Sequence, residues 1–196
     1  MVFASAVFGL LVLAAPASAN VLPDQFDAEN GGAGTLNYTS FADFTVSSGS
    51  VDLIGNTYFD NFPGNGLYVD MAGSTGQFGA LTTDTIYGPG TYHVTIGLGG
   101  SIYADIADGV NVNWGSGNWS SNNLAGLSTN TFEFDITLAG ASAITIADLG
   151  NSGNPNIGAT LFGITVEQTR AVPEPLTLSL LGAGLAGMGA IRRRKR

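Results

Sequence analysis

The side chains that could carry out catalysis are sparse in this sequence of 196 residues. It has no cysteine, its single histidine is His93, and neither Lys nor Arg occurs before Arg170. Thiol nucleophiles, disulfides, Cys-ligated metal sites and Schiff-base lysines are therefore excluded from the central region. His93 lies between Tyr92 and Val94 in an alternating segment, so we expect it on the solvated face of a strand and not in a cleft. No catalytic residue is predicted.

Paired carboxylates are the remaining route to catalysis. The candidate acids are Asp52, Asp60, Asp70, Asp105 and Asp108. Glycosidases hold two carboxyl groups about 5–10 Å apart in a cleft, and a small β domain with short loops offers little cleft. We therefore favour a non-enzymatic protein and keep a glycan-processing enzyme as an alternative.

Two segments are rich in the oxygen ligands that calcium prefers. Asp24, Asp27 and Glu29 precede a pair of glycines, and Asp148 precedes three asparagines, which are Asn151, Asn154 and Asn156. Calcium takes about six to eight oxygens, but neither segment has the spacing of an EF-hand loop. Two interpretations stay open: a structural calcium ion with no assigned ligand set, or acids that keep the surface soluble.

Trp119 is the candidate glycan contact. Sugar binding commonly combines an aromatic ring with neighbouring amides, which offer an apolar face and hydrogen bonds together. Trp119 lies in residues 115–123, a stretch of Gly, Ser and Asn that predicts a polar loop. Trp114 instead continues the alternation of Val110 and Val112 and is expected in the core. The alternative for Trp119 is a loop anchor folded onto the domain.

Alternation of apolar and polar residues is the main structural signal in residues 20–170. Residues 131–138 place four apolar side chains on one face and polar ones on the other, which is typical of a strand with one wet face. Similar segments, separated by glycine- and proline-containing turns, occur at 51–54, 67–71, 80–87, 91–98, 110–114, 142–149 and 159–167. We predict one all-β domain over 20–170, a jelly-roll-like β-sandwich of about 8–9 strands.

Residues 50–55, 61–70 and 88–92 combine short strands with turn residues. Together they resemble the galactose-binding-like sandwiches of plant cell-wall proteins and carbohydrate-binding modules. The resemblance implies a jelly roll, and it suggests sugar binding by analogy only.

The N-terminus has the pattern of a secretory signal. Residues 2–15 are almost wholly apolar, and the small residues Ala17 and Ala19 follow in an A-x-A arrangement. This order is typical of a signal peptide and its cleavage site, and the apolar span is shorter than the about 20 residues that cross a bilayer. We assign residues 1–19 to a signal helix recognised by the secretion machinery. The alternative is a buried N-terminal helix.

The C-terminus changes character at the motif Val172, Pro173, Glu174 and Pro175. Two prolines cannot continue a strand ladder or a helix interior, so the motif predicts an exposed linker. Residues 176–191 are uncharged and would form a transmembrane helix of about 24 Å, short for a hydrocarbon core of about 30 Å. The basic tail stays cytoplasmic by the positive-inside rule, and it comprises Arg192, Arg193, Arg194, Lys195 and Arg196.

This order of motif, short apolar helix and arginine-rich end resembles the PEP-CTERM sorting signal of Gram-negative bacteria, over residues 171–196. The resemblance implies export, transient anchoring in the inner membrane, and recognition and cleavage by an exosortase. It also implies association with exopolysaccharide or biofilm matrix. The alternative is an ordinary single-span anchor that keeps its tail.

The charge distribution separates these pieces. The net charge of −9 and pI near 4.1 argue against nucleic-acid binding, which needs clustered Lys and Arg. Processed to residues 20–175, the chain would hold fifteen acids and one base, a formal charge of −14. We expect an exported, non-enzymatic protein of the cell surface or extracellular matrix with weak carbohydrate binding. The alternatives are a purely structural or adhesive surface protein and the glycan-processing enzyme.

Overall fold

The computed structural model describes residues 26–100, 108–124, 126, 128–150 and 152–171. The expected signal helix at 1–19 and the sorting segment at 172–196 lie outside these residues, and both stay predictions. None of the helical structure in the described part of the chain is long and apolar enough to cross a membrane.

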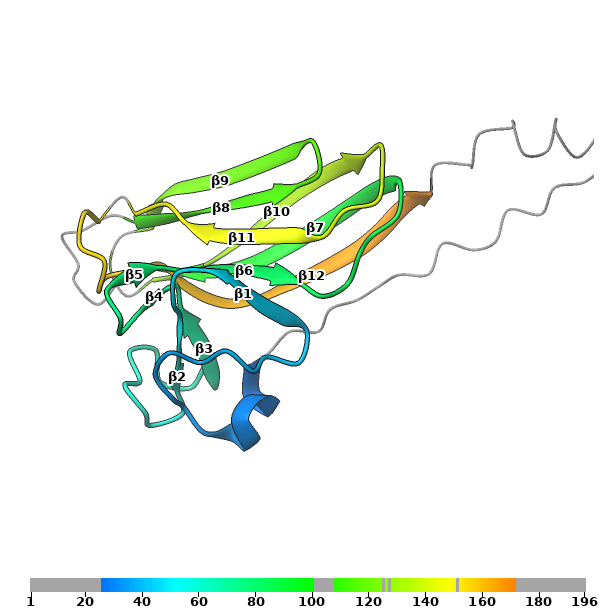
Figure 1. The fold of residues 1–196 in the computed structure, drawn as a ribbon. Helices are drawn as coiled ribbons and strands as arrows, with labels where there is room; N and C mark the ends of the chain where they lie inside the picture. Colours follow the sequence, from blue (N-terminus) through cyan, green and yellow to red (C-terminus); the bar gives the residue numbers. More distant parts are fainter. Residues whose placement is uncertain (1–25, 101–107, 125, 127, 151, 172–196) are drawn as a thin grey trace, which may run out of the picture. The chain divides into compact units, whose positions relative to one another are not determined.

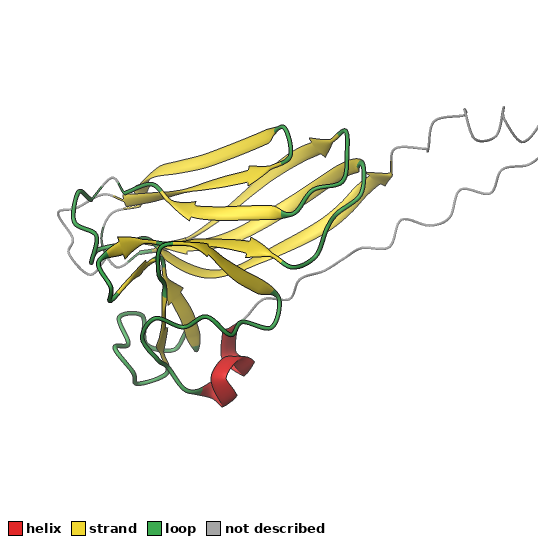
Figure 2. Ribbon diagram, in the orientation of Figure 1, coloured by secondary structure: helices red, strands yellow, loops and turns green. Residues whose placement is uncertain are grey.

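Strands dominate the described residues, with one short 3₁₀ helix (Figure 2). The elements are η1 (Phe26–Gly32), β1 (Phe44–Ser48), β2 (Asp52–Gly55), β3 (Leu67–Asp70), β4 (Ala72–Gly73), β5 (Gln77–Phe78), β6 (Ala80–Thr83), β7 (Gly90–Gly99), β8 (Asp108–Trp114), β9 (Gly117–Leu124), β10 (Thr129–Leu138), β11 (Ile144–Asp148) and β12 (Thr160–Ala171).

Two five-stranded antiparallel sheets form the layers of a sandwich (Figure 1). One sheet has the order β1-β6-β11-β8-β9, the other has the order β10-β7-β12-β3-β2, and β4 pairs with β5 separately. The prediction of an all-β, jelly-roll-like sandwich is confirmed. The strand count was too low, because β4 and β5 have two residues each and because β1 and β9 show no clear apolar alternation in sequence.

The core lies between the two sheets. Along β7 the apolar residues Val94, Ile96 and Leu98 are wholly buried, and each lies opposite a buried residue of β12, namely Val166, Ile164 and Leu161. The facing sheet contributes Val110, Val112, Ile144 and Ile146. Burying one such side chain stabilises the fold by about 1.5–3 kcal/mol, so alternation along the long strands accounts for the sandwich.

Trp114 closes one end of this core and is wholly buried, which confirms its predicted position. Its ring lies 4.8 Å from that of Tyr87 and 4.7 Å from that of Tyr92, and its Nε1 donates a hydrogen bond to the Ser142 carbonyl at 3.2 Å.

Glycine allows close backbone approach where β8 and β9 shift register. A Cβ at Gly109 would lie 1.9 Å from the Ser121 carbonyl oxygen, whereas a Cβ at Gly140 would meet nothing within 4 Å. We expect Gly109→Ala to lower the free energy of unfolding by about 1–3 kcal/mol, as overpacking does. Gly140→Ala, the control, should change it by less than about 0.5 kcal/mol. Urea unfolding of both variants checks this, and equal values would contradict the close packing.

Candidate functional site

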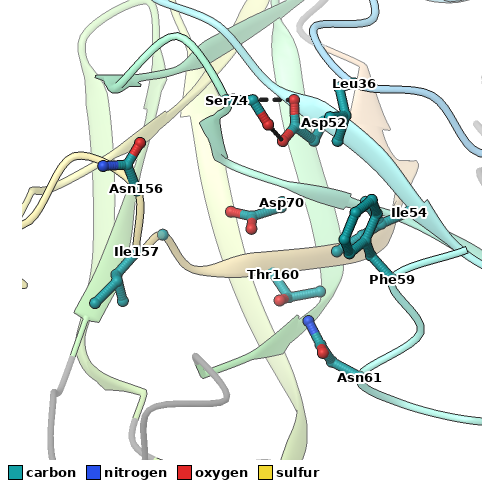
Figure 3. A pocket seen from close by; sticks show the side chains of 11 residues that line it. Leu36, Asp52, Ile54, Phe59, Asn61, Asp70, Ser74, Asn156, Ile157 and Thr160 are labelled. Carbon is teal, nitrogen blue, oxygen red and sulfur yellow. Dashed lines mark hydrogen bonds between the residues drawn. The ribbon is translucent and has the colours of Figure 1, made fainter.

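A pocket of about 200 Å³ lies beside β2 and β3, at the start of β12 (Figure 3). Its apolar wall is formed by Leu36, Ile54, Phe59 and Ile157. Its polar groups belong to Asp52, Asn61, Asp70, Ser74, Asn156 and Thr160. The pocket is thus assembled from three strands of one sheet, which are β2, β3 and β12, and from several loops, with apolar and hydrogen-bonding surfaces facing the same space.

Phe59 presents its ring to solvent from the loop between β2 and β3. Its side chain is 63% exposed, and its φ of 46° lies in the left-handed region that is rare for a bulky residue. Thr57 has a positive φ as well, at 78°. The loop is held by hydrogen bonds between Gly55 and Tyr58, at 2.8 and 2.9 Å. Such backbone strain costs about 1–3 kcal/mol per residue and is common at binding sites.

Asn61 is positioned by a buried network around Tyr68. The Asn61 and Phe62 amides donate to the Tyr68 hydroxyl oxygen at 2.6 and 3.0 Å, and this hydroxyl donates to Asp60 Oδ1 at 3.0 Å. Burial, with the neighbouring Asp60 carboxylate, raises the pKa of Tyr68 to about 12. The hydroxyl therefore stays protonated and keeps the loop closed.

Asp52 is a buried carboxylate with three donors. Its Oδ1 accepts from the Asn37 amide at 2.7 Å and the Ser74 amide at 3.1 Å, and its Oδ2 accepts from the Ser74 hydroxyl at 2.6 Å. These bonds connect β2 to two loops and fix Ser74 at the rim of the pocket.

Asp70 lies directly opposite Asp52 in the antiparallel register of β2 and β3. Figure 3 shows its carboxyl group in the middle of the pocket side chains. Burial is the main cause that raises the pKa of Asp70 to about 8; the negative charges of Asp52, Asp148 and Asp108 contribute to this value, and a hydrogen bond from the Ala72 amide at 2.9 Å opposes it. Asp70 is therefore largely protonated at neutral pH.

A second pair of acids, Asp108 and Asp148, lies near Asp70. Asp148 accepts hydrogen bonds from the Gly150 amide at 2.7 Å and the Ala159 amide at 2.9 Å. Burial, together with the charge of Asp108, raises the pKa of Asp148 to about 7. A Cβ at Gly158 would lie 2.9 Å from Asp70 Oδ1, so this position needs glycine for the wall to close on the carboxyl.

The structure brings together only some of the acids that the sequence suggested. Asp52 and Asp70 share the pocket, Asp60 supports its loop, Asp108 is buried behind it, and Asp105 lies outside the described residues. The pairing of Asp52 with Asp70 depends on strand register, which the sequence did not specify.

Neither expected calcium segment forms a recognisable metal site in the described residues. These residues contain no group of three or more His, Asp or Glu arranged to hold a metal ion. Asp27 accepts from the Leu67 amide at 2.7 Å, and Glu29 accepts from the Ala42 amide at 2.8 Å. Asp24 and Asn151 lie outside the described part, so calcium stays a prediction.

Trp119 lies on strand β9, and the prediction of a loop is wrong. It pairs with Val112 in register, so it points to the inner face of the sandwich. Its ring stacks on Phe134 at 4.5 Å with an interplanar angle of 6° and contacts Phe132 at 5.3 Å. The strand was not predicted, because the Gly, Ser and Asn residues around Trp119 are typical of loops. The role of Trp119 as a glycan contact stays a prediction. The alternative role is packing at the edge of the core.

His93 lies on the solvated face of β7, as predicted, with 37% of its side chain exposed. Its Nδ1 is 2.8 Å from Asp135 Oδ1, and this hydrogen bond raises the pKa of His93 above its ordinary value. The cleavage residues Ala17 and Ala19, the motif at 172–175 and the basic tail at 192–196 lie outside the described residues.

Residues 171–195 match the PEP-CTERM protein-sorting motif. The resemblance of the C-terminal segment to a PEP-CTERM sorting signal is thereby confirmed. The motif indicates an exported protein that is anchored in the membrane through its C-terminal segment. No curated protein matches this chain.

Several solved structures resemble parts of this chain at low sequence identity. The tandem CBM22 domains of Xyn10C from Paenibacillus barcinonensis match with a TM-score of 0.50 and 9% identity, over 83% of this chain and 50% of that one. An exo-β-1,3-galactanase from Phanerochaete chrysosporium has a TM-score of 0.40 and 20% identity, over 68% of this chain and 29% of that one. An isomalto-dextranase of Arthrobacter globiformis has a TM-score of 0.42 and 16% identity, over 63% of this chain and 21% of that one.

The chain thus spans less than a third of these two enzymes' own lengths. The likeness to the CBM22 tandem domain of Xyn10C shows a shared β-sandwich fold, and it shows the fold alone.

The raised pKa of Asp70 predicts a pH-dependent stability. Between its ordinary pKa of 3.8 and its folded value of about 8, the folded protein holds a proton that the unfolded chain has released. The free energy of unfolding therefore falls as the pH rises through this range, by at most about 1.4 kcal/mol per pH unit for one proton. We expect Asp70→Asn to make this slope shallower in urea unfolding at about pH 5 to 8.

The matched control is Asp84→Asn, which changes an exposed carboxylate bonded to the Thr45 hydroxyl. It should leave the slope as in the parent protein. An Asp70→Asn slope identical to the parent slope would show that Asp70 is ionised in the folded state.

Proposed function

We propose that this protein is an exported, non-enzymatic protein of the cell surface or extracellular matrix whose sandwich domain binds carbohydrate in the pocket beside β2 and β3. Residues 1–19 direct secretion, and an exosortase cleaves near residues 172–175 and releases the domain from its anchor. The exopolysaccharide of the producing cell supplies the glycan.

The observation that carries the proposal is the composition of the pocket. Phe59 offers an exposed aromatic face, and Asn61, Asn156 and Asp70 offer amide and carboxyl groups around the same cavity. A sugar ring needs both an apolar surface for its C–H face and hydrogen-bonding groups for its hydroxyls, and small-molecule sites commonly combine the two. The sorting motif supports an encounter with glycans outside the cell.

Removal of the exposed ring tests this site. We expect Phe59→Ala to weaken glycan binding by about tenfold, equivalent to 1.4 kcal/mol, because the apolar platform is lost. The control is Ile86→Ala, which removes another exposed apolar side chain, 70% exposed, that does not line the pocket. A glycan array followed by calorimetry on the full chain provides the measurement.

Absence of binding to every glycan, including the matrix of the producing cell, would instead favour a purely structural or adhesive surface protein. Binding that is lost with Trp119→Phe and kept with Phe59→Ala would place the glycan at the sandwich edge.

The sorting step has its own test. In cells that contain an exosortase, mass spectrometry of the mature protein should show loss of the residues after Pro175, and in cells without it the tail up to Arg196 should remain. Replacing Pro173, Glu174 and Pro175 together by alanine should preserve the tail in both strains. An intact Arg196 terminus in exosortase-containing cells would identify an ordinary anchor.

Glycoside hydrolysis is a second candidate function, favoured by the opposition of Asp52 and Asp70. Directly opposed residues have Cβ atoms about 4.5–5.5 Å apart, so two such Asp side chains are neighbours, and retaining glycosidases use a pair of neighbouring carboxyl groups. Protonated Asp70 would act as the acid and Asp52 as the nucleophile. Release of reducing ends from matrix polysaccharide that disappears with Asp52→Asn would establish this activity in place of binding alone.

A further inference from the structure

We propose that the sugar recognised by the pocket carries a free amine, so that the ligand is a glycan with cationic amino-sugar units. This inference rests on the proposed carbohydrate binding and names the class of ligand for the same site. The inference is based on a cavity that combines an exposed aromatic ring with two opposed carboxyl groups and has no basic residue in its lining.

The charges around the pocket are of one sign. Asp52 and Asp70 line it, and Asp108 and Asp148 lie close enough behind it to affect Asp70. Among the described residues the only basic side chains are Arg170 and His93, and neither lines the pocket. A carboxylated sugar would therefore be repelled, whereas a cationic one would be attracted.

Asp70 is the group that an ammonium would meet. Asp52 is already occupied by three protein donors. The Asp70 carboxyl accepts one hydrogen bond from the described residues, from the Ala72 amide to Oδ1, and so its Oδ2 has capacity for a ligand donor. An ammonium carries three donors and satisfies such an oxygen directly.

An ammonium at this position would also compensate an unfavourable feature of the pocket. Burial disfavours the charged form of Asp70, and the charge of Asp52 directly opposite disfavours it further, so Asp70 holds a proton. A cation between them stabilises the charged form, so binding displaces the proton from Asp70. Phe59, at the rim, can contact the sugar ring or the cation with its face.

Proton release provides a direct measurement. At pH 7, calorimetry of the full chain with glucosamine oligosaccharides, repeated in buffers of different ionisation enthalpy, should show release of a fraction of a proton on binding. Asp70→Asn should abolish this release, and Asp84→Asn should preserve it. The Asp70→Asn protein is expected to fold, because the substitution removes a buried carboxyl that is repelled by its neighbours.

Ligand comparison gives the second readout. We expect glucosamine oligosaccharides to bind at least tenfold more tightly than N-acetylglucosamine oligosaccharides, galacturonate oligosaccharides to bind least, and the difference between the first two to vanish in Asp70→Asn. Equal affinity for the acetylated and free-amine forms, with both lost in Phe59→Ala, would overturn the amine and leave carbohydrate binding intact.

Two further outcomes are informative. Glucosamine binding that is retained in both Phe59→Ala and Asp70→Asn would indicate general attraction to an acidic surface. It would contradict the assignment of the pocket as the binding site. Absence of binding to all three glycans and to the cell's own matrix would overturn the proposed function together with this inference.

Discussion

Carboxylates in this domain are held by backbone N–H groups instead of by cations, and the loops around the pocket depend on those bonds. Arg170 is the only Lys or Arg among the described residues, so ion pairs are hardly available. Each of seven acids accepts a hydrogen bond from a backbone amide, and these are Asp27, Glu29, Asp52, Asp60, Asp70, Asp108 and Asp148. These hydrogen bonds order loops that are otherwise rich in glycine.

Backbone donors orient a carboxylate without neutralising it. Burial, and after it the charges of neighbouring acids, therefore raises the pKa of Asp70 and of Asp148. Partial protonation of Asp70 and Asp148 reduces the negative charge that the fold must bury. This arrangement makes the pocket sensitive to pH, and it favours any ligand whose positive charge compensates the carboxyl groups.

The sequence predicted the parts of the fold that depend on alternation alone. The long strands β7 and β10 were predicted because ten residues of alternating burial leave a clear pattern. Strand β9 was not predicted, because its sequence of Gly, Asn and Ser is typical of a loop; only the structure shows Trp119 paired with Val112 and stacked on Phe134 of the other sheet. The pocket could not be predicted, since Asp70 and Asn156 are far apart in sequence and only the sheet order brings them together.

The acids also explain how an exported, glycine-rich sandwich avoids pairing through its open edges. Strand β10 is a ten-residue edge of its sheet, and Glu133 and Asp135 on its exposed face oppose the approach of a second acidic copy. Strand β2 is covered by Thr35, which exchanges two hydrogen bonds with Leu53 at 2.8 and 3.0 Å. Strand β1 is short and irregular in register. Charge repulsion therefore protects the longest of these open edges, the ten-residue strand β10.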